Sequence, residues 1–299
     1  MSDDKTSDSD SLIDGLDFGV GATSIHGLED FTDLIFWIES NRNHLPIKDL
    51  LSRGYISEDT QDVDALNILG SSIGQGGKLF RAGNLQENDK RSALINTWVS
   101  LVGNIAEKRT ANPFEKASFT KKWLLDFVKI SQNPNKITEL SSVLAEIGII
   151  LVIEPSFEGL GIDGVVSVNN NGNPVIGHSV RFDRLDNFWF TLLHELSHIY
   201  LHYDSISTPI IEDFESHGED VVAIEKEADY FATNLVVPNS VWRRCDVIRK
   251  QTAKSVTALA KQLDIHPALI AGKFRYEKNR FEMFSDMVNE VSVRRILGV

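Results

Sequence analysis

The sequence predicts an α+β fold in which helices surround a short sheet, and three observations support this. Three apolar, strand-like runs lie between residues 149 and 180: IILVIEP, GVVSV and PVIGHSV, the last two joined by the turn-forming NNNGN. Helical periodicity precedes them in residues 135–148, where Gly148 is a natural C-cap, and follows them in 188–202 and 223–238. Finally, 42% hydrophobic and 24% charged residues in a chain of 299 are typical of a globular protein.

Composition and charge limit the functions that this chain can have. The formal net charge of −13 argues against a broad binding surface for nucleic acid or for an anionic membrane. Cys245 is the single cysteine, so the chain cannot build a disulfide framework or a thiolate metal cluster, and a reducing cytosol suits it. The acidic, serine-rich start is unlike a secretory signal, and no run approaches the roughly 18 apolar residues of a membrane-spanning helix. We therefore expect a cytoplasmic protein that binds neither membrane nor nucleic acid directly.

The N-terminal part of the chain is predicted to be a polar tail followed by helices. Residues 1–20 are too polar to bury a core, so a disordered tail is expected there. The run GSSIGQGGKLFR (70–81) superficially resembles a phosphate-binding loop. However, Ser72 and Leu79 stand where that loop requires a glycine and a serine or threonine, so a flexible loop is predicted instead. Helices are predicted in residues 28–38, 46–54, 91–107 and 115–130.

The C-terminal part contains a segment with helix-turn-helix spacing, VTALAKQLDIHPALIAGKF (256–274). Only Lys273 and Arg275 place positive charge near the end of its second helix, whereas DNA reading needs basic side chains along that helix. A packing or partner-binding role is therefore favoured. The predicted organisation is a tail (1–20), a helical N-terminal region (21–132), an α+β core (133–248) and a helical C-terminal segment (249–299).

The stretch FWFTLLHELSHIYLH (188–202) carries the strongest chemical signal. Asp186 or Asn187 can N-cap a helix there, and residues four apart on a helix share a face. His194 and His198 can therefore close on one ion, and zinc suits imidazole and carboxylate ligands. Glu195 can take a proton from water that the metal has acidified. A zinc ion that only stabilised the fold would instead be closed by a fourth protein ligand.

A zinc hydrolase of this kind needs a third ligand, and the helix AIEKEADYFATNLVVP (223–238) offers two candidates. Glu225 and Glu227 are about 200° apart on this helix, so they cannot both face one ion. Both flank its apolar stripe, and periodicity does not choose between them. His202 lies one turn beyond His198, but three successive turns of a straight helix spread their side chains over about 12 Å. His202 is therefore expected to support the site rather than to bind the metal.

The combination of HELSH with EKEADYFATNLVVP, about 25 residues later, resembles the ImmA/IrrE family of zinc metallopeptidases. That family pairs HExxH with a downstream helix of the form E-A-D/N-x-F-A-x-x-L-x-x-P. The resemblance implies a zincin-like core with Zn²⁺ bound by His194, His198 and Glu227, and with Glu195 as the catalytic base. His202, Tyr203 and Tyr230 are then possible supports of the ligands or of the transition state.

The resemblance extends to the longer branch of the family, which is usually fused to a helix-turn-helix repressor module. Segments such as PIKDLLSRGYI and AEIGIILVIEP carry this likeness, but residues 21–45 lack the pattern of such a module. The repressor is therefore expected to be a separate partner. In zincins, the strand before the active-site helix is an edge strand that pairs with the extended backbone of the substrate. By this resemblance, PVIGHSVRF (174–182) is the candidate for such a substrate-binding strand. The alternative is an ordinary sheet strand.

By this resemblance, the expected function is a zinc endopeptidase that cleaves a helix-turn-helix repressor and thereby induces stress, mobile-element or phage-defence genes. The alternative is a toxin–antitoxin-like component that acts by binding a helix-turn-helix partner rather than by hydrolysis. The intact HExxH favours hydrolysis, because binding alone would not require Glu195.

Overall fold

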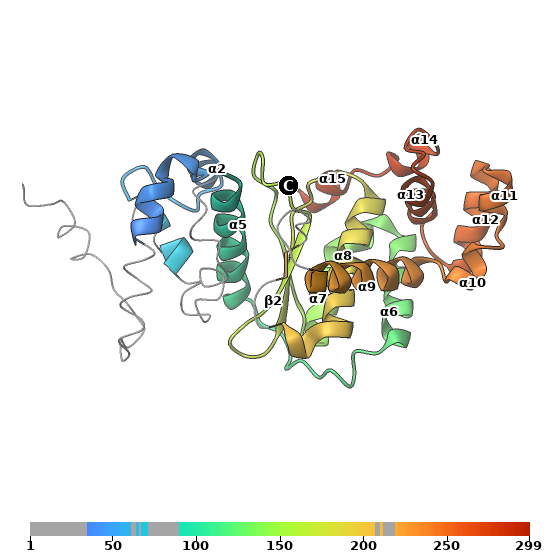
Figure 1. Ribbon diagram of the computed structural model, residues 1–299, viewed down its shortest axis with the longest axis horizontal. Helices are drawn as coiled ribbons and strands as arrows, with labels where there is room; N and C mark the ends of the chain where they lie inside the picture. The colour runs from blue at the N-terminus through green and yellow to red at the C-terminus, as the bar shows by residue number, and fades with distance from the viewer. Residues whose placement is uncertain (1–34, 61–63, 66, 71–89, 207–209, 212–218) are drawn as a thin grey trace, which may run out of the picture. The chain divides into compact units, whose positions relative to one another are not determined.

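The computed structural model describes residues 35–60, 64–65, 67–70, 90–206, 210–211 and 219–299 (Figure 1). The chain divides into two compact units, Met1–Asn104 and Ile105–Val299. The predicted tail (1–20) and all but the first residue of the predicted loop (70–81) lie outside the described residues.

The described part of the first unit is helical. It contains a helix at 35–41, the 3-10 turn η2 (Arg42–His44), α2 (Ile47–Ser52) and α5 (Lys90–Glu107), whose last turn enters the second unit. Gly54 follows α2 with φ +73°, the left-handed conformation that commonly ends a helix. The helices predicted at 46–54 and 91–107 are therefore confirmed, while most of the predicted 28–38 helix lies outside the described residues.

The second unit is built on a sheet whose described strands follow the order β1-β3-β2-β4. Their bounds are β1 Ile150–Ile153, β2 Gly164–Val168, β3 Pro174–His178 and β4 Ile210–Ile211. β3 runs parallel to β1 and antiparallel to β2, with Gly164 opposite His178. The three predicted strands are confirmed. β3 lies between β1 and β2 in the described sheet, so of the two alternatives for this segment the structure fits the ordinary sheet strand and not the edge strand.

Helices pack against this sheet, so the α+β prediction is confirmed. α7 packs on β1, and α8 packs on β2 and β3; in Figure 1, α7, α8 and α9 lie on the same side of the sheet. Among the described residues, no helix has the length and apolar composition required to cross a bilayer. The described helices of this unit are α6 Lys121–Phe127, η4 Val128–Gln132, η5 Pro134–Glu139, α7 Leu140–Glu146, α8 Leu185–His202, η6 Tyr203–Ser205, α9 Glu219–Val236, α10 Asn239–Trp242, α11 Asp246–Lys250, α12 Ala253–Leu263, α13 Pro267–Lys278, α14 Ser285–Val288 and α15 Val293–Leu297.

Several helix ends differ from the prediction because local capping decides them. The helix expected from residue 115 begins at Lys121, where the Thr120 hydroxyl accepts the Trp123 N–H. The helix expected from residue 135 begins as the 3-10 helix η5 and becomes α7 only at Leu140. Gly148, with φ +85°, lies just beyond its end as predicted.

The helix that carries HELSH begins earlier than expected. α8 starts at Leu185 after Arg184, which makes no side-chain cap, so the prediction that Asp186 or Asn187 is the N-cap is wrong. Asp186 lies instead in the first turn, where its buried carboxylate accepts two hydrogen bonds from the Arg184 guanidinium. A carboxylate near a helix N-terminus is also favoured by the helix dipole.

The segment with helix-turn-helix spacing forms α12 and α13, but its second helix is buried. All residues of α13 from Ala268 to Arg275 are buried, and the helix packs on α8. A recognition helix must expose its side chains to the DNA groove. Of the packing or partner-binding role that the sequence favoured, packing fits α13, which supports the helix that carries the histidines.

Candidate metal centre

α8 and α9 bring the site together because each has one apolar face and the two faces pack against each other. Leu192, Leu193, Leu196 and Ile199 of α8 have no solvent exposure. On α9, the small Ala228 and Ala232 are buried, and small side chains allow neighbouring helices to approach closely. The polar residues that share these faces are consequently buried beside the core.

Three side chains converge on one point. His194 Nε2 lies 2.9 Å from His198 Nε2. Glu225 Oε2 lies 3.0 Å from His194 Nε2, and Oε1 lies 3.4 Å from His198 Nε2. One ligand atom from each residue lies within 4.8 Å of the other two. Each of these side chains is buried, with a residue exposure of 5% or less.

The protonation states of the group fit a divalent cation. Burial lowers the pKa of His198, so its imidazole is neutral near pH 7, the form that binds metals. Burial alone would raise the pKa of Glu225, but His194 and His198 outweigh it and lower the pKa to about 2. Glu225 Oε1 is buried and makes no hydrogen bond of normal geometry within the described part of the chain. Two imidazoles and an ionised carboxylate are a suitable donor set for zinc.

Glu195 directly follows His194 on α8, and its carboxylate lies against β2. It is 1% exposed. Gly164, the first residue of β2, is so close that a Cβ atom placed on it would lie 2.3 Å from Glu195 Oε1. The carboxylate is thus held against the sheet, next in sequence to one of the histidines.

Asp229 orients one of the histidines. Its Oδ1 lies 2.9 Å from His194 Nδ1, so the other ring nitrogen, Nε2, faces His198 and Glu225. A carboxylate that holds the remote nitrogen of a histidine fixes its tautomer and makes it a better metal ligand. Asp229 lies four residues after Glu225 on α9, so one helix face supplies both carboxylates.

Of the two candidates for the third ligand, the structure brings Glu225 to the two histidines, and not Glu227, which the resemblance implied. The Glu227 side chain is 59% exposed, and its Oε2 lies 3.7 Å from His202 Nε2. Glu225 is on the buried line of α9 that continues through Ala228 and Ala232 at helical spacing, whereas Glu227 is off this line. The two small alanines were the signal in the sequence that could have selected Glu225.

The other predicted site residues lie around the group. His202 is one turn beyond His198, with 5.8 Å between the ring centroids. Tyr203 donates its hydroxyl to the Gly172 carbonyl at 2.6 Å, which ties the end of α8 to the β2–β3 turn. Tyr230 is 63% exposed on α9. Their roles in supporting the ligands or a transition state stay predictions.

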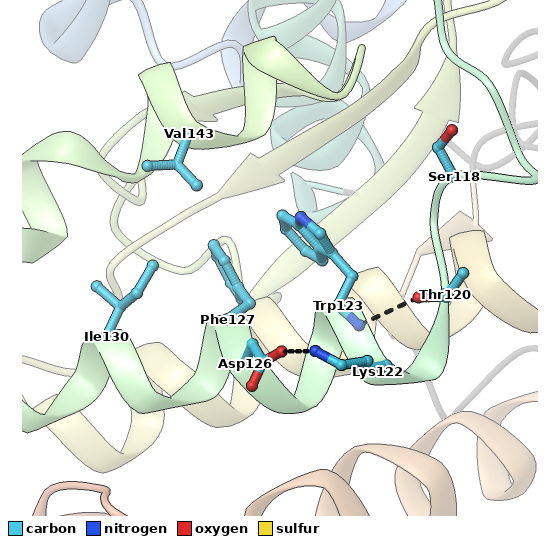
Figure 2. A pocket seen from close by; sticks show the side chains of 8 residues that line it. All are labelled: Ser118, Thr120, Lys122, Trp123, Asp126, Phe127, Ile130 and Val143. Carbon is cyan, nitrogen blue, oxygen red and sulfur yellow. Dashed lines mark hydrogen bonds and ion pairs between the residues drawn. The ribbon is translucent and has the colours of Figure 1, made fainter.

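A separate cavity of about 420 Å³ lies at α6, and no member of the metal-ligand group lines it (Figure 2). Trp123 and Phe127 stack along it with 4.8 Å between ring centroids, and Lys122 pairs with Asp126 at its rim. It is therefore distinct from the cluster of histidines and Glu225.

Comparison with known proteins agrees with this geometry. Residues 146–266 match the family model Peptidase_M78, described as an IrrE N-terminal-like domain. No curated protein matches the chain. The matched range contains β1 to β4, both histidines, Glu195, Glu225 and Asp229, and the match supports a metallopeptidase-type function. Residues 146–266 are thus similar to the IrrE N-terminal-like domain that this family model describes, which is consistent with the ImmA/IrrE resemblance of the sequence.

Proposed function

We propose that this protein is a zinc-dependent endopeptidase with a zincin-like core. The observation that carries the proposal is the convergence of His194, His198 and Glu225, inside the region that matches a peptidase family. Glu195, the residue after His194, is also buried. Three protein ligands are typical of catalytic zinc sites, which keep one position for water or substrate, whereas structural sites are closed by four.

His194, His198 and Glu225 would hold the ion, and Asp229 would keep His194 in the required tautomer. Zinc bound there would supply Lewis acidity, which polarises a carbonyl group and makes water easier to deprotonate. The Glu195 carboxylate accepts a proton from the attacking water. The water oxygen bonds to the peptide carbon, the C–N bond breaks, and Glu195 passes the proton to the amine that leaves.

The proposed substrate is a helix-turn-helix repressor, whose cleavage would induce stress, mobile-element or phage-defence genes. The resemblance to the ImmA/IrrE family supports this part of the proposal. A cytoplasmic location is proposed with it, since that is where such a repressor acts.

The experiment compares wild-type protein with Glu195→Gln, both loaded with zinc. Each is incubated with any small helix-turn-helix protein that the neighbouring open reading frames are found to encode and, separately, with a proteome-derived peptide library. New N-termini are identified by mass spectrometry. We expect cleavage by the wild-type protein and a loss of about 100-fold or more in Glu195→Gln, because general-base catalysis contributes roughly 10²–10⁴-fold.

The zinc content of Glu195→Gln should equal that of the wild-type protein, since Glu195 is not a proposed ligand. Absence of fragments from the wild-type protein in both assays would contradict the proposal. If Glu195→Gln instead kept the full cellular phenotype while retaining zinc, the protein would act by binding its partner.

A further inference from the structure

Gly164 stands where β2 comes closest to the Glu195 side chain. A Cβ atom placed on Gly164 would lie 2.3 Å from Glu195 Oε1 and 3.0 Å from its Cδ. It would also lie 3.0 Å from the Thr191 methyl group, one turn earlier on α8. Side-chain atoms do not pack this closely, so the Glu195 carboxylate occupies the space that any other residue at position 164 would fill.

The backbone of Gly164 does not itself require glycine. Glycines with positive φ occur elsewhere in the unit, at Gly159, Gly161 and Gly172, but Gly164 is not among them. Its conformation is therefore one that alanine adopts without strain. Position 164 requires a residue without a side chain, because Glu195 fills the space that a side chain would occupy.

The strand cannot easily withdraw from α8 to make room for a larger residue. Gly164 is in register with His178 on β3, and the backbone carbonyl of the preceding Asp163 accepts the Ser179 N–H at 2.9 Å. The Asp163 carboxylate also binds the Arg181 guanidinium at 2.6 and 3.1 Å. The Ser179 hydroxyl donates to the Ile162 carbonyl at 2.9 Å. The movable part of the contact is therefore the Glu195 side chain.

We propose that Gly164 is a positioning residue for Glu195: the space left by its absent side chain sets where the proton-accepting carboxylate lies relative to the metal-ligand group. Its catalytic consequence rests on the proposed peptidase function. An alanine at position 164 would push the carboxylate away while leaving His194, His198 and Glu225 untouched, and a small displacement of a proton acceptor is costly for catalysis.

The packing is tested by a stability cycle on the full-length, metal-free protein. Thermal unfolding is measured for wild type, Gly164→Ala, Glu195→Ala and the double variant Gly164→Ala/Glu195→Ala. Overpacking should lower the Tm of Gly164→Ala by about 5 °C. In the Glu195→Ala background, the same change should lower the Tm by no more than about 2 °C, since the carboxylate is gone.

The functional consequence is tested on the zinc-loaded protein. Gly164→Ala should bind zinc within about 3-fold of the wild-type affinity, as its ligands are intact. Its kcat on the peptide library should fall by about 100-fold, and its KM should change little. Ser167→Ala, on the same strand but adding no atom next to α8, is the matched control and should keep wild-type stability and activity.

Each outcome decides the proposal. An equal Tm loss in both backgrounds, or no loss in either, shows that Glu195 does not fill the space and overturns it. Loss of zinc in Gly164→Ala overturns it too, because Gly164 would then support the whole helix. Should Gly164→Ala fail to fold, recovery of folding in the double variant supports the proposal, and failure of both overturns it. If the wild-type protein cleaves nothing, the proposed function fails, while the stability cycle still decides the packing.

Discussion

At the scale of single residues, Glu225 and Glu227 form a natural pair for comparison because only two positions of α9 separate them. Glu225 is buried against His194 and His198, and Glu227 lies in solvent near His202. We predict that Glu225→Gln weakens zinc binding by more than about 100-fold, since it removes a charged ligand. Glu227→Gln should bind zinc within about 3-fold of wild type. Competition with a chromophoric chelator measures both affinities.

The result for these two variants decides whether the third ligand is Glu225, as the structure indicates, or Glu227, as the sequence resemblance implies. If Glu227→Gln lost zinc while Glu225→Gln kept it, α9 would have to be rotated about its axis, and Glu225 would not be the third ligand. Equal, small effects in both variants would mean that the histidines bind zinc without a carboxylate from α9.

The limit of prediction from sequence is visible in these same residues. His194, Glu195 and His198 could be identified because their spacing is local and one helix turn brings them together. The choice between Glu225 and Glu227 depends on how α9 is rotated against α8, which is tertiary information. Asp229 was missed for the same reason: its contact with His194 Nδ1 joins two helices.

His178 gives a prediction about pH. Its ring donates from Nε2 to the Phe188 carbonyl at 3.1 Å and accepts the Val180 N–H at Nδ1. Burial lowers the pKa of His178 to about 4, whereas an unfolded histidine has a pKa of about 6.5. Between these values the unfolded chain binds a proton that the folded protein does not. The free energy of unfolding therefore has its full value above about pH 6.5. Protonation of this residue in the unfolded chain lowers it on acidification, by about 2 kcal/mol at pH 5.

The measurement compares wild type with His178→Asn, in metal-free protein, by denaturant unfolding at pH 8 and pH 5. His178→Asn should be less stable at pH 8, and its deficit should shrink by about 2 kcal/mol at pH 5, because asparagine does not titrate. A deficit that stays constant between the two pH values would show that His178 titrates normally in the folded protein.

At the scale of elements, the start of α8 depends on the C-terminal helix α15. Arg294 donates from its guanidinium to the Val180 carbonyl at 3.0 Å and to the Arg181 carbonyl at 2.7 Å. The Asp183 carboxylate accepts hydrogen bonds from the Arg294 backbone N–H and from the Ser292 hydroxyl. Ser292 is the N-cap of α15, and its hydroxyl accepts the Arg295 N–H. The segment between β3 and α8 is thus tied down by residues about 110 positions later in the chain.

We predict that Arg294→Ala lowers the free energy of unfolding by about 1–2 kcal/mol, the magnitude expected for hydrogen bonds from a charged donor. It should also increase hydrogen exchange of the amides in residues 180–186. The neighbouring Arg295→Ala is the matched control and should change stability by less than about 0.5 kcal/mol. Equal effects of the two changes would show that the loss of stability comes from altered helix propensity and not from the hydrogen bonds of Arg294 to the Val180 and Arg181 carbonyls.

The strands could be predicted because they are apolar runs, two of which are joined by a turn-forming segment. The β2–β3 turn shows how its residues determine the local structure. Asn169 accepts the N–H groups of Asn171 and Asn173, and Gly172 has φ +80°, so the turn residues do what their types favour. The two-residue β4 and the start of α8 at Leu185 depend on partners elsewhere in the fold, so local pattern could not give them.

At the scale of the whole molecule, the metal-ligand group belongs to the unit Ile105–Val299. The described hydrophobic core around the site runs from Phe119 to Val293 and takes all its buried members from this unit. α6 contributes Leu124 and Phe127, and η4 contributes Val128. The core thus extends before residue 133, where the sequence placed the start of the α+β core; the predicted four-part division itself stays a prediction.

These contacts predict how two fragments should behave. Residues 105–299 contain the whole described core of the unit, so this fragment should fold and bind zinc within about 3-fold of the full chain. Residues 133–299 lack four buried side chains of that core, Phe119, Leu124, Phe127 and Val128. Burying each is worth about 1.5–3 kcal/mol, a sum that approaches the whole stability of a typical domain. The shorter fragment should therefore be insoluble or molten, as circular dichroism and thermal unfolding would report. A stable, zinc-binding 133–299 fragment would instead show that α6 is an accessory to the domain rather than a part of its core.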